Sequence, residues 1–498
     1  MPSEAYNAFI QCVKEINTAT SIEGILEWDQ ETYMPTKAAE TRAAQLALVA
    51  GIGHQKLIDE EFGLLLENVE QEQDEDPVVA TNVRETRRIY DRKVKLPTSL
   101  VQQIATATAL ARSAWVKARQ DSDFPHFAPH LKTLLELKRQ VAEKIGYEEE
   151  PYDALMDEFE PGVRASDVQR IFDEVKSELV PIVQAIQDAP NQPDTSILER
   201  EFPQRNQEAF ARKIIGAMGF DFEAGRVDVS AHPFCSGQSP LDVRLTARYN
   251  EHFLPMALFG LMHEAGHGLY EQGLGAQHAF TPMGTSVSHG IHESQSRLWE
   301  NLVGRSRPFW AHYFPQLQKA FPSLADVSLD AWYFAINNVR PSLIRVEADE
   351  VTYNTHIMLR FDLERQMIQG KLTVKDVPAA WNAGMEKLLG VTPPSDDQGC
   401  LQDIHWSMGV FGYFPSYALG NLYACQFFQA ASQAIHELDV KLARGNLEPL
   451  RQWLRENIHA HGQHYRANEL VERVTGEPLS PQPFIDYLTT KFKPLYGF

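Results

Sequence analysis

The chain has 498 residues, of which 43% are hydrophobic and 23% are charged, and its formal net charge is −21 at pH 7. This is the composition of an ordinary globular protein, and the acidic balance excludes nucleic acid and an anionic membrane surface as the main partner. The four cysteines are widely spaced, so they indicate neither a disulfide framework nor a cysteine zinc site.

The N-terminal residues and the longest apolar stretch carry no targeting signal. The first 20 residues lack the basic start and the apolar run of a signal peptide. Residues 253–262 are too few to cross a bilayer. With so few cysteines, we expect a cytoplasmic protein.

From residue 3 to about residue 189 the sequence is typical of successive amphipathic helices. Apolar residues recur at helical spacing, for example at Leu134, Leu137 and Val141, and prolines mark the breaks between helices. We find no repeat of fixed period and no low-complexity linker. We therefore predict a mostly helical, two-lobed body with lobes that flank a cleft, in a single domain over residues 1–498.

Residues 226–249 change to a strand pattern. The segments 226–234 and 240–249 alternate apolar and polar residues, and the residues between them have the composition of a turn. We predict a small antiparallel sheet directly before the next helix. Its edge can bind an extended peptide through main-chain hydrogen bonds, or the hairpin simply closes the core; the sequence does not separate these roles.

The segment Leu254–Gly273 combines a helix pattern with a metal-ligand pattern. A proline suits its first turn, a glycine suits its end, and apolar residues cover much of its circumference, so we predict a buried helix. His263, Glu264 and His267 lie in its middle, although burying polar or charged groups is unfavourable without a metal or hydrogen bonds.

The spacing of these three residues favours a metal. His263 and His267 lie on one helix face, about 6 Å apart along the axis, and Glu264 points to the side, where it can hold an attacking water. This is the H-E-x-x-H arrangement of zinc hydrolases. The alternative is two core histidines that hydrogen-bond to carbonyl groups, which is the more common role for a single buried histidine.

A zinc hydrolase needs three protein ligands and one open position. Glu271 continues the series but lies about 12 Å from His263 along the helix axis, so the third ligand must come from another element. The next predicted helix, residues 288–304, begins with two candidates, His292 and Glu293. A carboxylate suits a peptidase zinc, so we choose Glu293; its alternative role is an ion pair with an arginine one turn later.

The motif H-E-A-G-H at 263–267, followed by H-E-S-Q at 292–295, resembles the carboxypeptidase Taq family of zinc metallocarboxypeptidases. Further motifs of that family occur in order along the whole chain and are more specific together than one pentapeptide. They are E-W-D-Q-E-T-Y-M-P at 27–35, H-P-F at 232–234, D-V-R-L-T at 242–246, I-R-V-E-A-D at 344–349, G-C-L-Q-D-I-H-W at 399–406 and T-G-E-P-L at 475–479.

This resemblance implies a nearly all-helical fold with a deep substrate groove, similar to angiotensin-converting enzyme and neurolysin. It implies that His263, His267 and Glu293 bind zinc, for which cobalt can substitute, and that Glu264 is the catalytic base. It also implies a homodimer. The expected reaction is hydrolysis of the C-terminal peptide bond of peptides, with broad side-chain preference.

Relatives with a similar groove stabilise the oxyanion with histidine and tyrosine, which by resemblance assigns His405 and Tyr417 to catalysis and Tyr413 to substrate binding. The alternative role of the tyrosines is core packing with a hydroxyl group at the surface.

Arginine is best suited to bind the free C-terminal carboxylate, and Arg345 is the candidate. The alternative for Arg345 is an internal ion pair with Glu347 or Asp349. Arg244 is a second candidate, and by resemblance its motif and that of His232 close one end of the groove.

Two other functions compete with this interpretation. A zinc endo-oligopeptidase would use the same chemistry in the same kind of groove. A non-catalytic helical scaffold that binds peptides would hold structural metal or none. Glu264 and the open fourth position weigh against the scaffold.

Asp349 and Asp403 are candidates for a further role, in which they hydrogen-bond to the metal ligands and orient them.

Overall fold

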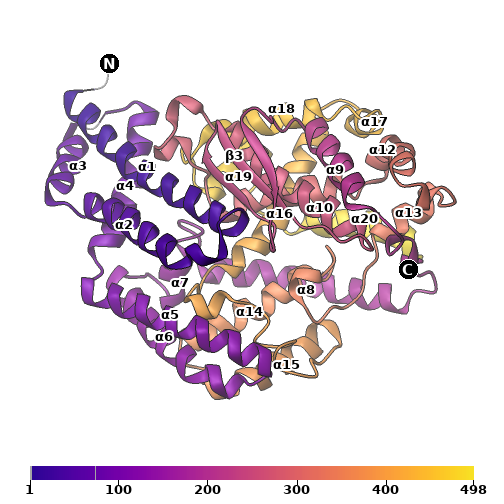
Figure 1. The fold of residues 1–498 in the computed structure, drawn as a ribbon, viewed down its shortest axis with the longest axis horizontal. Helices are drawn as coiled ribbons and strands as arrows, with labels where there is room; N and C mark the ends of the chain where they lie inside the picture. Colours follow the sequence, from indigo (N-terminus) through magenta and orange to yellow (C-terminus); the bar gives the residue numbers. More distant parts are fainter. Residues whose placement is uncertain (1–2, 73) are drawn as a thin grey trace. The chain divides into compact units, whose positions relative to one another are not determined.

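The computed structural model describes residues 3–72 and 74–498 and is mostly helical, which confirms the predicted fold class (Figure 1). The chain divides into two compact units. Unit 1 comprises Met1–Lys93, Pro193–Ile336 and Ala424–Pro478, and unit 2 comprises Val94–Gln192, Asn337–Tyr423 and Leu479–Phe498. The single domain over residues 1–498 and the substrate groove stay predictions.

Unit 1 holds the three strands and the helices α1 (Glu4–Thr32), α2 (Ala39–Leu57), α3 (Glu60–Glu72), α4 (Pro77–Val94, apart from its last residue), α9 (Gln204–Met218), α10 (Leu254–Gly273), α11 (His289–Arg297), α12 (Arg307–Ala320), α13 (Leu329–Ile336), α17 (Leu438–Ala443), α18 (Glu448–Asn457) and α19 (Ala467–Thr475). Unit 2 holds α5 (Thr98–Asp121), α6 (Phe124–Ile145), α7 (Pro151–Met156), α8 (Ala165–Asp188), α14 (Tyr353–Ile368), α15 (Val377–Leu389) and α20 (Gln482–Tyr496). Helix α16 (Phe414–Ala434) begins in unit 2 and ends in unit 1. No helix among the described residues is both long enough and apolar enough to cross a membrane.

The small sheet is mixed and not antiparallel as predicted. Its strands are β1 (Gly225–Val229), β2 (Cys235–Ser239) and β3 (Asp242–Ala247), in the order β1-β3-β2. β3 pairs parallel with β1 and antiparallel with β2, so most of the predicted turn is itself a strand. Alternation of apolar and polar residues identifies the face of a strand but not its direction.

The connection between β1 and β2 explains the parallel pairing. The Ser230 hydroxyl donates to Thr246 Oγ1 at 2.7 Å, and the Phe234 amide donates to the same oxygen at 2.9 Å. These bonds hold residues 230–234 against β3 while the chain crosses over. They also tie together the H-P-F and D-V-R-L-T motifs, which lie in contact in unit 1.

The helix α10 has the predicted bounds and is buried, and β2 and β3 pack against it. Leu258, Leu261 and Ala265 are at most 1% exposed. A Cβ atom on Gly268 would lie 2.9 Å from the Phe220 ring and 3.0 Å from Leu245. The missing side chain at this position therefore allows the sheet to lie directly on the helix.

The predicted helix 288–304 begins as α11 and ends as a π-helical turn. Ser288 caps the start, because its hydroxyl accepts the Ile291 amide at 3.1 Å. The turn Leu298–Val303 follows directly and winds more widely than an α-helix. Such turns are frequent at functional sites because they redirect side chains.

Candidate metal centre

The structure brings the three predicted metal ligands together in unit 1. Ligand atoms of His263, His267 and Glu293 all lie within 4.8 Å of one another. Glu293 Oε2 lies 3.5 Å from His263 Nε2 and 3.3 Å from His267 Nε2. Two ligands of one tetrahedral zinc ion lie about 3.4 Å apart when each bond is about 2.1 Å, so this donor set fits zinc.

The hydrogen bonding of His263 indicates that the cluster needs a cation. His263 Nδ1 lies 2.9 Å from Glu300 Oε2, and the carboxylate accepts the Nδ1 proton. In the neutral imidazole, Nε2 then turns a lone pair toward the Glu293 carboxylate. These two acceptors repel each other unless a metal ion or a proton lies between them.

Burial and neighbouring charges shift the pKa values of the ligands in different directions. Burial lowers the pKa of His267 to about 3. Burial also acts to lower the pKa of His263, but the Glu293 and Glu300 carboxylates raise it above its ordinary value. Burial acts to raise the pKa of Glu293, yet Arg297 and His263 hold it well below its usual range. The cluster therefore keeps its carboxylate ionised, as ligation requires.

Arg297 and Glu300 surround the outer side of this cluster. Arg297 Nε donates to Glu293 Oε1 at 2.7 Å, and Arg297 NH1 lies 3.4 Å from Glu300 Oε2. The ion pair considered as an alternative role for Glu293 is therefore present together with the ligand arrangement, because the two oxygens of Glu293 face opposite ways. Burial acts to raise the pKa of Glu300, but the hydrogen bond from His263 and the charge of Arg297 lower it to about 2.

His267 is supported by a neighbouring ring. The rings of His267 and His292 stack with centroids 4.4 Å apart and 18° between their planes. His292 Nε2 in turn lies 2.8 Å from Glu271 Oε1. His292 and Glu271, which were not chosen as ligands, thus form a pair beside His267. The Nδ1 atom of His267 is buried and has no hydrogen-bond partner in the described part of the chain.

Glu264 is 8% exposed, and burial raises its pKa to about 7. Its neighbours His263 and Glu293 shift this pKa in opposite directions, downward and upward respectively. A carboxylate with a pKa near neutrality can both accept and release a proton at physiological pH.

In unit 2, Arg345 is buried and its guanidinium group has partners. Arg345 Nε and NH2 donate to Asp403 Oδ1 at 3.1 and 2.9 Å, and NH1 donates to the Tyr353 hydroxyl at 2.9 Å. Arg360 Nε donates to the other oxygen of Asp403 at 2.6 Å. Burial acts to raise the pKa of Asp403, but the two arginines lower it strongly.

These contacts favour an internal ion pair as one role of Arg345, with Asp403 as its partner in place of Glu347 or Asp349. The Asp349 side chain accepts instead from backbone amides of unit 2, at Arg340, Val351 and Thr352. In unit 1, Glu300 is the carboxylate that contacts a predicted metal ligand, His263. The role of Asp349 and Asp403 toward the ligands stays a prediction.

His405, Tyr413 and Tyr417 form a ring cluster in unit 2. His405 Nε2 lies 3.3 Å from the Tyr417 hydroxyl, and the Tyr413 and Tyr417 rings lie 5.1 Å apart. Burial lowers the pKa of His405 to about 4, so this imidazole is neutral at pH 7. A neutral imidazole and a hydroxyl group each carry one donor, and the contact between His405 and Tyr417 uses one of the two. Groups of this kind can stabilise a developing oxyanion.

Arg244 and His232 lie in unit 1. Arg244 donates to both carboxylate oxygens of Asp242, at 2.8 and 2.9 Å, and its guanidinium lies 4.3 Å from the Trp28 ring centre. His232 is exposed, and its carbonyl oxygen accepts the Ser230 hydroxyl at 2.6 Å. Arg244 lies in β3 and His232 lies in the connection between β1 and β2, while their role toward substrate stays a prediction.

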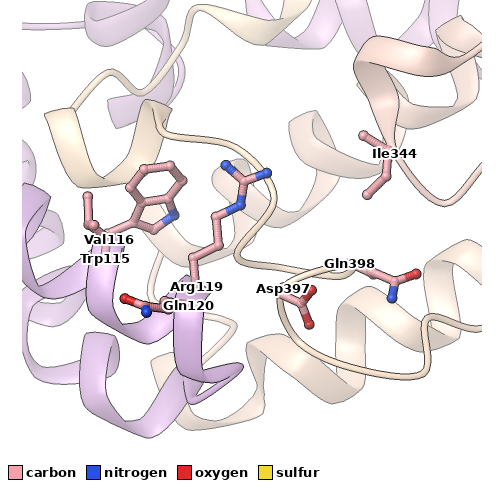
Figure 2. Close-up of a pocket in the computed structure, with 7 residues that line it drawn as sticks. All are labelled: Trp115, Val116, Arg119, Gln120, Ile344, Asp397 and Gln398. Carbon is pink, nitrogen blue, oxygen red and sulfur yellow. The ribbon is translucent and has the colours of Figure 1, made fainter.

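A surface hollow of about 490 Å³ lies elsewhere in unit 2 (Figure 2). It is lined by Trp115, Val116, Arg119, Gln120, Ile344, Asp397 and Gln398. The guanidinium group of Arg119 lies 5.4 Å from the Trp115 ring centre. None of its lining residues is a predicted site residue, so the hollow carries no assignment.

Comparisons with known proteins identify the family of the chain. The model of the family described as Carboxypeptidase Taq (M32) metallopeptidase matches residues 8–492. The chain belongs to the carboxypeptidase Taq family. Thermostable carboxypeptidase 1 of Thermus thermophilus is 45% identical, with 100% of both chains covered, and carboxypeptidase 1 of Bacillus subtilis is 37% identical, with 98% of both covered. The crystal structure of an M32 carboxypeptidase from Deinococcus radiodurans R1 is 41% identical, with 100% of both chains covered and a TM-score of 0.97.

Membership of the carboxypeptidase Taq family makes this chain a metallocarboxypeptidase, as the motifs predicted. Two features of the cluster were not predicted from the sequence: the contact of Glu300 with His263 and the pair of His292 with Glu271. A signal for the first was present in the sequence, since Glu300 is the one charged residue in the mostly apolar run 298–303 after Arg297.

Proposed function

We propose that this chain is a zinc carboxypeptidase that removes single residues from the free C-termini of peptides, with His263, His267 and Glu293 as metal ligands. The observation that carries the proposal is the convergence of these three ligand atoms within 4.8 Å, next to a buried Glu264. Two imidazoles and one carboxylate leave one position open, as in catalytic zinc sites. Cobalt fits the same donor set and is an alternative metal.

The chemistry at this centre is assigned as follows. When bound, zinc acts as a Lewis acid that polarises the scissile carbonyl and acidifies the attacking water. Glu264 takes the proton of this water and passes it to the leaving amine. The developing oxyanion requires donors, and we assign His405 and Tyr417 to this role, with Tyr413 in substrate binding.

Recognition of the C-terminus is assigned to Arg345, with Arg244 as the second candidate. The three hydrogen bonds of Arg345 to Asp403 and Tyr353 use three of the five N–H groups of a guanidinium. The other two remain for a substrate carboxylate. An aspartate occupies the two-pronged face of both arginines, Asp242 at Arg244 and Asp403 at Arg345, so the preference for Arg345 rests on its family motif. We assign Arg244 and His232 to the end of the substrate groove.

Peptides that differ only at their ends test the proposal. An N-blocked peptide with a free C-terminus is incubated with the enzyme beside its C-terminal amide, and the products are identified by mass spectrometry. We expect stepwise loss of C-terminal residues from the free acid alone. Cleavage of both peptides at internal bonds would identify an endo-oligopeptidase instead.

Removal and return of the metal complete this test. Treatment with a chelator should abolish cleavage, and added zinc or cobalt should restore it. If the wild-type protein binds no metal and cleaves neither peptide, the alternative function, a non-catalytic helical scaffold, is supported instead. A panel of C-terminal residues then measures the breadth of side-chain preference.

We also propose a cytoplasmic location and a homodimer. All four cysteines are free thiols, which suits a reducing compartment. The homodimer rests on the family resemblance, and sedimentation of the metal-loaded enzyme tests it. A single species at the monomer mass of 56.4 kDa would exclude it.

A further inference from the structure

The outer sides of two metal ligands are joined by two other side chains in unit 1. His263 donates its Nδ1 proton to Glu300 Oε2 at 2.9 Å, and the same oxygen lies 3.4 Å from Arg297 NH1. Arg297 Nε then donates to Glu293 Oε1 at 2.7 Å. The path runs from one ligand through Glu300 and Arg297 to the other ligand, and a bound metal would close it into a ring.

We propose that Arg297 and Glu300 act together as one positioning unit, which fixes His263 and Glu293 at the same time and thereby sets the affinity of the metal centre. The proposal rests on the proposed metal site and extends it to residues outside the ligand set. We name this pair the Arg297–Glu300 brace.

Each half of the brace selects one ligand atom. Because Glu300 holds the proton on His263 Nδ1, the lone pair of this ring is left on Nε2, which faces the cluster. Because Arg297 occupies Glu293 Oε1, Glu293 Oε2 is the oxygen that faces the two imidazoles, and it also accepts the Ser296 hydroxyl at 3.0 Å. The brace therefore determines the tautomer of one ligand and which oxygen of the other faces the cluster.

The brace is shielded from water, so its charges are weakly screened. The exposed fraction of the side chain is 14% for Arg297, 14% for Glu300 and 7% for Glu293. An exposed ion pair of this kind contributes little, whereas a buried charge-assisted hydrogen bond holds its geometry firmly. Arg305, 3.4 Å from Glu300 Oε1, supplies a second positive charge on the far side of this carboxylate.

The π-helical turn places Glu300 in the brace. Glu300 is the third residue of the turn Leu298–Val303, and Arg297 is the last residue of α11. Widening of the helix at this point changes the direction of the side chains that follow. This gives the π turn a role in the metal centre.

A double-mutant cycle on zinc affinity tests the brace. Glu300→Gln keeps the size and a hydrogen-bond acceptor for His263 but removes the charge, and Arg297→Lys keeps the charge but loses the fork that reaches two carboxylates. Zinc dissociation constants of the wild type, both single variants and the double variant are measured by competition with a chromophoric chelator. The unfolding temperature of each metal-free protein is measured alongside.

We expect each single variant to bind zinc about 10- to 100-fold more weakly, and the double variant to be no weaker than the worse single variant. The metal-free unfolding temperatures should fall as well, because breaking a buried ion pair costs stability, so the zinc dissociation constants carry the test. Arg170→Lys is the matched control, because Arg170 and Glu174 form an i, i+4 pair on an exposed face in unit 2. Its zinc affinity should equal that of the wild type.

Three results would overturn the brace. Single variants that bind zinc as tightly as the wild type would contradict it. A double variant whose loss of zinc affinity equals the product of the two single losses would contradict it as well. Lower metal-free unfolding temperatures with unchanged zinc affinity would reduce the pair to a stabilising contact. A wild type that binds zinc without cleaving peptides would refute the carboxypeptidase but leave the brace standing, while a wild type without zinc at this cluster would refute both.

Discussion

The backbone of Gln295 on α11 crosses α10 at Gly266, the residue directly before the second histidine ligand. A Cβ atom on Gly266 would lie 2.6 Å from the Gln295 carbonyl oxygen and 2.6 Å from the Ser296 Cα atom. Both neighbours are backbone atoms, so neither can turn aside as a flexible side chain would. The glycine thus sets how closely Glu293 approaches the histidine pair.

Gly266→Ala should separate the two helices. We expect a loss of about 1–3 kcal/mol in the free energy of unfolding from overpacking, and a zinc affinity at least about tenfold weaker because Glu293 moves away. Urea unfolding of the metal-free protein measures the first effect, and chelator competition measures the second.

Gly260→Ala is the matched control on the same helix. A Cβ atom at Gly260 would meet no atom within 4 Å. Here alanine should stabilise the helix by about 0.5–1 kcal/mol and leave zinc binding unchanged. Equal behaviour of the two variants would contradict the close crossing.

Glu264→Gln separates metal binding from catalysis. The variant keeps the shape of the side chain but cannot accept the proton of the attacking water, so kcat should fall by about 10²- to 10⁴-fold. The metal content, measured by mass spectrometry of the dialysed protein, should stay at the wild-type level. A variant with wild-type turnover would exclude Glu264 as the base.

The sequence was informative where spacing translates directly into geometry. His263 and His267 share a face because an α-helix repeats every 3.6 residues. The choice of Glu293 over His292 needed the preference of a peptidase zinc for a carboxylate together with the family resemblance. Glu300 could not be placed in this way, because it reaches His263 only through a π-helical turn, and helical spacing assumes that no such turn intervenes.

The direction of the strands was beyond the sequence for a similar reason. Alternation identified β1 and β3 but placed them in a hairpin, whereas a crossing held by Ser230 and Thr246 makes them parallel. Arg345 illustrates a third limit. Its motif suggested a partner nearby in sequence, yet Asp403 is 58 residues away.

Arg345→Ala tests recognition of the C-terminus. If two of its N–H groups bind the substrate carboxylate, the variant should raise KM for free-acid peptides by about 10-fold or more and leave amidated peptides unaffected. Steady-state kinetics are measured well below the unfolding temperature, because loss of the buried pair with Asp403 also costs stability. Equal changes in KM for both kinds of peptide would show that Arg345 does not bind the C-terminus and that its role is the ion pair with Asp403.

The buried carboxylate of Glu364 organises the segment that carries His405 and Tyr413. Its oxygens accept hydrogen bonds from the Trp406 indole at 2.8 Å, the Tyr152 hydroxyl at 2.8 Å and the Gly412 amide at 3.0 Å. Burial nevertheless raises its pKa from 4.5 to about 7.

Glu364→Gln should therefore change the pH dependence of stability. Since the folded pKa lies above the unfolded value, the folded state binds more protons between pH 4.5 and 7, and the contribution of Glu364 to stability falls as pH rises through this window. Glutamine mimics the protonated acid at every pH, so the wild type should lose roughly 3 kcal/mol relative to the variant from pH 4.5 to 7.5. Urea unfolding of both proteins across this range measures the difference, and a difference that does not vary with pH would show that Glu364 has an ordinary pKa in the folded protein.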